Sequence, residues 1–156
     1  MTSRRLRCQA FAFAVDDHLH DLIALALGAT RDASELAKGR GVRSARLHAL
    51  KADIAANITR HDLSVVSVAA RHGISARYIR TLFMDAGTTF TDFVLYQRLA
   101  RVHRLLMDPR AHPRTISAIA YDSGFGDLSY FNHAFRRRYG ATPSDIRAAA
   151  RQDYRG

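Results

Sequence analysis

One order of residue types occurs twice in the chain, in Thr115-Ile-Ser-Ala-Ile-Ala-Tyr-Asp-Ser-Gly-Phe-Gly-Asp127 and earlier in Ser64-Val-Val-Ser-Val-Ala-Ala-Arg-His-Gly-Ile-Ser75. In each copy a hydroxyl residue opens a short helix, a glycine ends it, and a large apolar residue follows. Gly73 and Gly124 can supply the left-handed backbone that a tight turn between two helices requires. The repeat predicts two helix-turn-helix units in one chain.

A second helix is expected after each turn, capped by Ser75 in the first copy and by Asp127 in the second. Apolar residues four positions apart would face the core, namely Ile79 and Phe83 in one copy and Phe131 and Phe135 in the other. The opposite, polar face of each helix would then be exposed. Such a helix fits the major groove of DNA, which is about 12 Å wide.

A long amphipathic segment, 89–107, joins the two copies and is expected to stop at Asp108-Pro109. At 1.5 Å per residue a helix of this length spans about 28 Å. Successive major grooves on one face of DNA lie roughly 34 Å apart. The segment can therefore hold two recognition helices about one turn of DNA apart.

The rest of the chain also favours helix, because it has only three prolines and no sustained alternation of apolar and polar residues beyond 10–15. We interpret residues 10–15 as a short strand or a tail. Ser44 is expected to cap a helix that follows a joint at Gly39–Gly41 and carries an apolar stripe as far as Ile58. The other predicted helices cover 17–27, 31–38, 64–72, 75–85, 115–123, 127–139 and 143–151. The fold class is therefore all-α.

The composition favours a polyanionic partner, with 24 Lys plus Arg against 14 Asp plus Glu and a formal net charge of +10. Nucleic acid is the first candidate and an anionic membrane surface the second. All the basic residues except Lys38 and Lys51 are arginine, a skew that a coding bias of the source would also produce. The charge indicates a class of partner without locating the site.

The single cysteine, Cys8, excludes an intramolecular disulfide and a multi-cysteine metal site. It fits a reducing compartment, and no apolar run approaches the roughly 20 residues of a membrane helix. Residues 4–15 faintly resemble a signal peptide, but Gln9 interrupts the apolar run. We therefore expect a cytoplasmic protein that binds no membrane. With DNA as its polyanionic partner, it would be associated with the nucleoid.

The stretch 47–150 resembles the C-terminal DNA-binding domain of the AraC/XylS family of bacterial transcription regulators. The most specific match is Ile119–Arg147, with its Gly-Phe pair, two phenylalanines and closing Gly-x-Thr-Pro. Supporting matches are Ser75–Phe83, Gly87–Phe90, Arg98-Leu99 and Leu105-Leu106. The resemblance implies a seven-helix, homeodomain-like pair of helix-turn-helix subdomains joined by a central helix. It also implies sequence-specific binding to promoter DNA, usually to activate transcription through RNA polymerase.

The resemblance also implies which residues contact bases. In the first recognition helix these are Arg77, Arg80 and Thr81, and in the second they are Leu128, Ser129, Asn132 and His133. Arg77 and Arg80 project from one helix face, and either can bind guanine O6 and N7. Thr81 and His133 stand where many members have arginine. The second helix is therefore expected to read less sequence and to position the protein instead.

The candidates for phosphate contacts are Ser75, Arg98, Tyr130 and Arg136. The alternative to DNA contact is that arginines such as Arg77 and Arg80 are solvated surface residues without a binding role. A helix splays the run Arg136–Arg138 over three directions, so only one or two of its members would touch phosphate.

We assign residues 1–45 to a short N-terminal helical segment and 46–152 to the DNA-binding domain. Within it the first helix-turn-helix covers about 64–86, the linker helix 89–107 and the second helix-turn-helix 115–139. Family members usually carry a sensory or dimerisation domain before this one. Residues 1–45 resemble its last helices or a replacement for it, in a natural short member, a truncated gene product or an engineered fragment.

Other functions fit the sequence less well. The stretch 16–21 has metal-ligand composition, but on a helix His18 and His20 point apart, so no metal is expected. No catalytic motif, catalytic residue or cofactor site is recognisable. Pairing of two copies through 17–38 is compatible with DNA binding. The alternative function is a dimerising interaction module that uses this pairing alone, or a dominant-negative short regulator with weak DNA specificity.

Overall fold

The computed structural model describes residues 28, 30, 38–111 and 113–153. The chain divides into two compact parts, Met1–Ala45 and Arg46–Gly156, and both helix-turn-helix units described below lie in the second part. All regular structure in the described residues is helical, which confirms the predicted all-α fold. The expected strand or tail at 10–15 and the expected helix at 17–27 lie outside the described residues, as does nearly all of the proposed dimerisation segment 17–38.

A helix occupies residues 38–56, and it corrects the sequence prediction at its start. Ser44 lies inside this helix rather than at its N-terminus, and Gly39 and Gly41 are helical rather than a joint. Neither glycine has a positive φ. A glycine inside a helix costs about 1 kcal/mol relative to alanine but does not forbid the helical conformation, so its neighbours decided the outcome.

The first helix-turn-helix unit consists of α2 (Val65–His72) and α3 (Ala76–Asp85). Ser64 caps α2 through its Oγ, which accepts a hydrogen bond from the Ser67 N–H, while Ser67 Oγ accepts one from the Ser64 N–H. Gly73 ends α2 with φ 62°, in the left-handed conformation. Ser75 then caps α3 by accepting a hydrogen bond from the Tyr78 N–H. The predicted turn chemistry is confirmed here.

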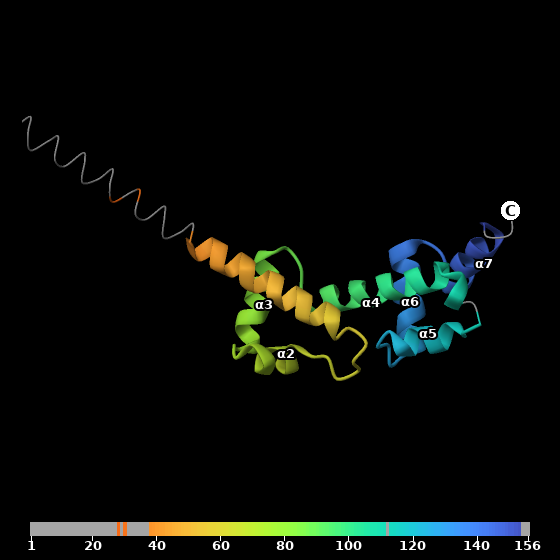
Figure 1. Ribbon diagram of the computed structural model, residues 1–156, viewed down its shortest axis with the longest axis horizontal. Coiled ribbons are helices and arrows are strands. Elements are labelled where there is room, and N and C mark those ends of the chain that lie inside the picture. The colour runs from red at the N-terminus through yellow and green to blue at the C-terminus, as the bar shows by residue number, and fades with distance from the viewer. Residues whose placement is uncertain (1–27, 29, 31–37, 112, 154–156) are drawn as a thin grey trace, which may run out of the picture. The chain divides into compact units, whose positions relative to one another are not determined.

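The central helix α4 (Phe90–Met107) lies between the α2–α3 pair and the α5–α6 pair (Figure 1). It begins at Thr89, whose Oγ1 accepts a hydrogen bond from the Asp92 N–H. It ends at Asp108, before the short 3-10 helix η1 (Pro109–Ala111). The long linker helix and its stop before a proline are therefore confirmed.

The second helix-turn-helix unit consists of α5 (Ile116–Asp122) and α6 (Leu128–Tyr139), followed by α7 (Pro143–Asp153). Thr115 and Asp127 cap α5 and α6, as predicted. Ser123 is the C-terminal cap of α5, and Gly124 follows with φ 94°.

Two separate hydrophobic cores share α4, which changes partners between Val94 and Leu95. Its first part supplies Phe90 and Val94 to the core of the first unit. Its later turns supply Leu95, Leu99, Val102 and Leu106 to the core of the second unit. The first core also contains Leu50, Ile54, Ile58, Val68, Ala69, Ile79, Leu82 and Phe83. The second also contains Ala111, Ile119, Ala120, Phe125, Phe131, Ala134 and Phe135.

Candidate nucleic-acid interface

Helix α3 presents the three residues that were predicted to contact bases. Arg77, Arg80 and Thr81 are all exposed, because the other face of the helix is anchored in the core by Ile79, Leu82 and Phe83. The Thr81 hydroxyl donates a hydrogen bond to the carbonyl of Arg77 at 3.2 Å. Its donor is thus engaged within the helix, whereas the two guanidinium groups remain available for a partner.

Helix α6 brings its predicted base-contacting residues to one surface. Leu128, Ser129, Asn132 and His133 are exposed. The last three line a shallow depression of about 320 Å³ together with Arg136 and the start of α7 at Thr142 and Pro143. Phe131, Ala134 and Phe135 anchor the opposite face of α6 in the core. The neighbouring Thr142 and Pro143 were not singled out as site residues, because nothing in their local pattern predicts a place beside α6.

The two recognition helices can be aligned by their caps, Ser75 and Asp127. Arg77 then corresponds to Ser129, Arg80 to Asn132 and Thr81 to His133. The first helix thus carries two cations where the second carries a hydroxyl and an amide. The exposed faces of α3 and α6 therefore differ in charge and in the hydrogen bonds that they can make.

Three of the four predicted phosphate contacts lie at the surface. Ser75, Tyr130 and Arg136 are exposed, and Ser75 Oγ also caps α3. In the run Arg136–Arg138, Arg138 Cζ lies 5.6 Å from the centroid of the Tyr96 ring, whereas Arg136 lines the depression beside α6. The helix therefore separates these arginines.

Arg98, the fourth predicted phosphate contact, occupies a different environment. It is partly buried, its Nε donates a hydrogen bond to the Ile58 carbonyl at 3.1 Å, and its Nη2 donates one to the Arg60 carbonyl at 2.7 Å. Burial lowers the pKa of the Arg98 guanidinium below its ordinary value. Sequence reasoning missed this arrangement, because its acceptors are backbone carbonyls about forty residues away in the chain.

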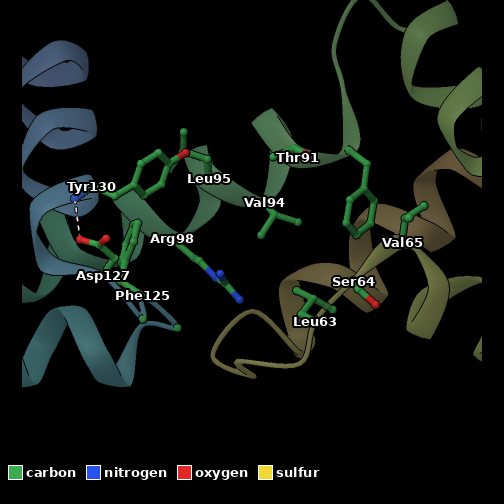
Figure 2. Close-up of a pocket in the computed structure, with 13 residues that line it drawn as sticks. Leu63, Ser64, Val65, Thr91, Val94, Leu95, Arg98, Phe125, Asp127 and Tyr130 are labelled. Atoms are coloured by element: carbon green, nitrogen blue, oxygen red, sulfur yellow. Dashed lines mark hydrogen bonds between the residues drawn. The ribbon is translucent and has the colours of Figure 1, made fainter.

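Arg98 also lines a cleft of about 590 Å³ that is bordered by the start of α2, the first half of α4 and the turn between α5 and α6. Figure 2 shows its side chain reaching from α4 into this cleft, with Phe125 and Tyr130 towards one side and Leu63 and Ser64 towards the other. The cleft therefore borders both helix-turn-helix units.

The described residues contain no group of three or more histidine, cysteine, aspartate or glutamate side chains that could hold a metal ion. The stretch 16–21, with its metal-ligand composition, lies outside them. No helix in the described part of the chain is long and apolar enough to cross a membrane.

The arrangement defines a double helix-turn-helix protein, with two outward-facing polar helices carried on one central helix. Comparison with known proteins agrees, since a family model described as "Helix-turn-helix domain" matches residues 68–149. The transcriptional activator RhrA of Rhizobium meliloti (strain 1021) is 40% identical over 105 residues, which are 67% of this chain and 33% of RhrA. This chain thus corresponds to about a third of the length of that relative.

Solved structures show the same fold. A transcriptional regulator with an AraC-type DNA-binding domain from Chromobacterium violaceum matches with a TM-score of 0.62 and 28% identity, covering 69% of this chain and 93% of that one. The DNA-binding domain of AdpA, solved in complex with a target DNA, matches with a TM-score of 0.58 and 25% identity, covering 69% and 94%. The chain belongs to the AraC/XylS family of transcription regulators.

Proposed function

We propose that this chain is a sequence-specific DNA-binding transcription regulator that inserts α3 and α6 into successive major grooves of promoter DNA. The observation that carries the proposal is the presence of two exposed, polar recognition helices on one continuous helix. Helix α4 has 18 residues, so it is about 27 Å long, close to the roughly 34 Å between successive grooves. The DNA complex of the AdpA domain, which has the same fold, supports this reading.

Arg77 and Arg80 are the principal base readers in this proposal, each suited to guanine O6 and N7. Thr81 offers its methyl group, since its hydroxyl donor already binds the Arg77 carbonyl. On α6, Asn132 suits adenine N6 and N7, while Ser129 and His133 make single hydrogen bonds and Leu128 an apolar contact with a thymine methyl. The first unit therefore supplies more of the sequence discrimination than the second.

The phosphate contacts come from exposed groups beside these readers. Arg136 is the clearest cation for this role, because it lies at the surface next to Asn132 and His133. Tyr130 and Ser75 can add hydrogen bonds near the start of each recognition helix. Such contacts hold the protein on DNA without reading its sequence.

The regulator is proposed to act as an activator, because RhrA and other relatives are transcriptional activators. The proposal also includes contact with RNA polymerase. The same proposal places it in the cytoplasm at the nucleoid and gives it no catalytic activity. Pairing of two copies through 17–38 is part of the proposal. Size-exclusion chromatography of the whole chain and of residues 47–156 tests this pairing, because only the whole chain should elute as a dimer.

The test of DNA binding is selection of bound fragments, followed by footprinting and a salt series. Protection should span about two turns of the major groove, and affinity should fall steeply as salt rises. Arg136→Ala should weaken binding to all sequences alike and reduce the salt slope by about 1. Retention of random and selected fragments with equal affinity would contradict the proposal.

A further inference from the structure

We propose that Arg98 and Gly124 form a joint that sets the separation and relative rotation of α3 and α6. Arg98 is a positioning residue in this joint, and it acts on the recognition helices through the backbone that it holds. The consequence for DNA, which rests on the function proposed above, is that the joint determines the spacing between the two base-pair segments that the chain reads.

The first half of the joint connects α4 to the first unit. Arg98 lies in the part of α4 whose apolar neighbours, Leu95 and Leu99, belong to the second core. Its guanidinium nevertheless donates to the carbonyls of Ile58 and Arg60, at 3.1 and 2.7 Å. Ile58 is itself a member of the first core. One side chain therefore ties the segment after the helix 38–56 to the part of α4 that packs in the second core.

The second half of the joint is the turn between α5 and α6, which lies directly against the same atoms. A Cβ atom built on Gly124 would lie 2.6 Å from Arg98 Nε, 2.8 Å from the Ile58 carbonyl oxygen and 2.9 Å from Arg98 Cζ. Only a residue without a side chain permits so close an approach. Three segments that are far apart in sequence thus converge on one point.

Among the residues that the structure describes, none belongs to both hydrophobic cores. Apart from the continuity of α4, the relative orientation of the units depends on the contacts between them. The His61 and Tyr121 rings add one, with centroids 4.5 Å apart, but Tyr121 is 60% exposed. The Arg98 contact is the more restrictive, since a planar guanidinium holds two acceptors in fixed directions.

Small errors in this orientation matter for a protein that reads two grooves. One base pair displaces the second groove segment by about 3.4 Å along the DNA and rotates it by roughly 34°, since a turn contains about 10.5 base pairs. A rigid joint therefore favours one spacing, and a loosened joint tolerates several.

The first experiment measures the joint without DNA. In a Cys8→Ser background, spin labels are attached through Met84→Cys on α3 and Arg137→Cys on α6, both exposed positions. Arg98→Met, which removes the guanidinium but keeps a long side chain, should broaden the distance distribution between the labels. Arg104→Met is the matched control, because it removes one exposed cation from the same helix. Equal widths in the two variants, with helix content unchanged, would overturn the proposal.

The second experiment measures spacing on DNA. Insertion of one base pair between the two selected segments should weaken wild-type binding about tenfold, the equivalent of losing one good base contact. Arg98→Met should show less than about threefold discrimination between the same two DNAs, while base preference within each segment stays unchanged. Arg104→Met should retain the wild-type discrimination.

The salt dependence separates positioning from a direct phosphate contact. If Arg98 only positions the two units, the DNA affinity of Arg98→Met should depend on salt concentration with the same slope as that of Arg104→Met. A slope smaller by about 1 in Arg98→Met, with uniform weakening at every spacing, would show that Arg98 binds phosphate and overturn the proposal. If the wild type selects no sequence, the proposed function fails, and the spin-label distances still decide whether the joint exists.

Discussion

The two helix-turn-helix units use the same turn in different surroundings. Gly73 has φ 62°, and a Cβ placed on it would meet nothing within 4 Å. Gly124 has φ 94°, and a Cβ there would lie within 3 Å of Arg98 and of the Ile58 carbonyl oxygen. The first glycine satisfies a local requirement of the backbone, whereas the second also permits contact with another part of the protein.

The recognition helices differ in a parallel way. They share a cap, an apolar face and a length that suits the major groove, but Arg77 in one corresponds to Ser129 in the other. A guanidinium can bind guanine through two hydrogen bonds, whereas a serine hydroxyl makes one short contact. Although the two helices have the same fold, we expect α3 to discriminate between base pairs more strongly than α6. The predictions below test the differences in the turns, in base recognition and in ionic contacts.

The largest effect is expected from alanine at the two turn glycines. Gly73→Ala should lower the free energy of unfolding by about 1–2 kcal/mol, the cost of a left-handed conformation with a side chain. Gly124→Ala should cost about 1–3 kcal/mol more, because its Cβ would overlap Arg98 and the Ile58 backbone. Urea unfolding of the three proteins measures both values. Equal losses would mean that the turn of the second unit relaxes away from Arg98 without penalty.

The next effect concerns base reading. Arg77→Ala should cost about 1–3 kcal/mol on the preferred site and relax the preference at one base pair. Ser129→Ala, the equivalent change on α6, should cost less than about 1 kcal/mol. Titration of each variant against all four base pairs at each position measures the difference. If Arg77→Ala weakens every sequence to the same extent, α3 does not read bases through this residue.

The smallest effect concerns an ionic contact that is specific to the first unit. Asp53, in the helix 38–56, binds Arg71 and His72 at the end of α2, with Oδ2 2.8 Å from Arg71 Nη2 and 3.3 Å from His72 Nε2. Burial raises the pKa of Asp53, but the hydrogen bonds and charges of Arg71 and then His72 outweigh it. They hold the pKa below the ordinary value of 3.8.

Because the folded protein holds Asp53 ionised, this contribution to stability is present above about pH 4 and is lost as the pH falls through the lowered pKa. Asp53→Asn should therefore show a shallower loss of stability between about pH 5 and pH 2. Asp122→Asn, which removes an exposed carboxylate paired with Arg114 in the second unit, gives the baseline and should cost at most about 1 kcal/mol at neutral pH. An acid dependence as steep in Asp53→Asn as in the wild type would argue against this role.

Where the governing contacts are local, the sequence-based predictions are confirmed. The predicted helix starts Ser64, Ser75, Thr115 and Asp127 each accept a hydrogen bond from the backbone N–H three residues further on. The prediction failed at Gly39–Gly41 and Ser44, where weak local preferences were outweighed by the continuity of the helix 38–56. The base and phosphate roles of the exposed residues stay predictions.

The sequence by itself determined the two turns, the capped helices and the polar faces that they expose. Each of these depends on side chains within about four positions of one another, where residue type controls conformation directly. Only the tertiary structure decided where Arg98 binds and that Gly124 must lack a side chain for a second reason, its close approach to Arg98 and the Ile58 carbonyl oxygen. The partners there are backbone carbonyls, which every residue possesses, so no pattern of residue types could indicate which carbonyls the folded chain brings to Arg98.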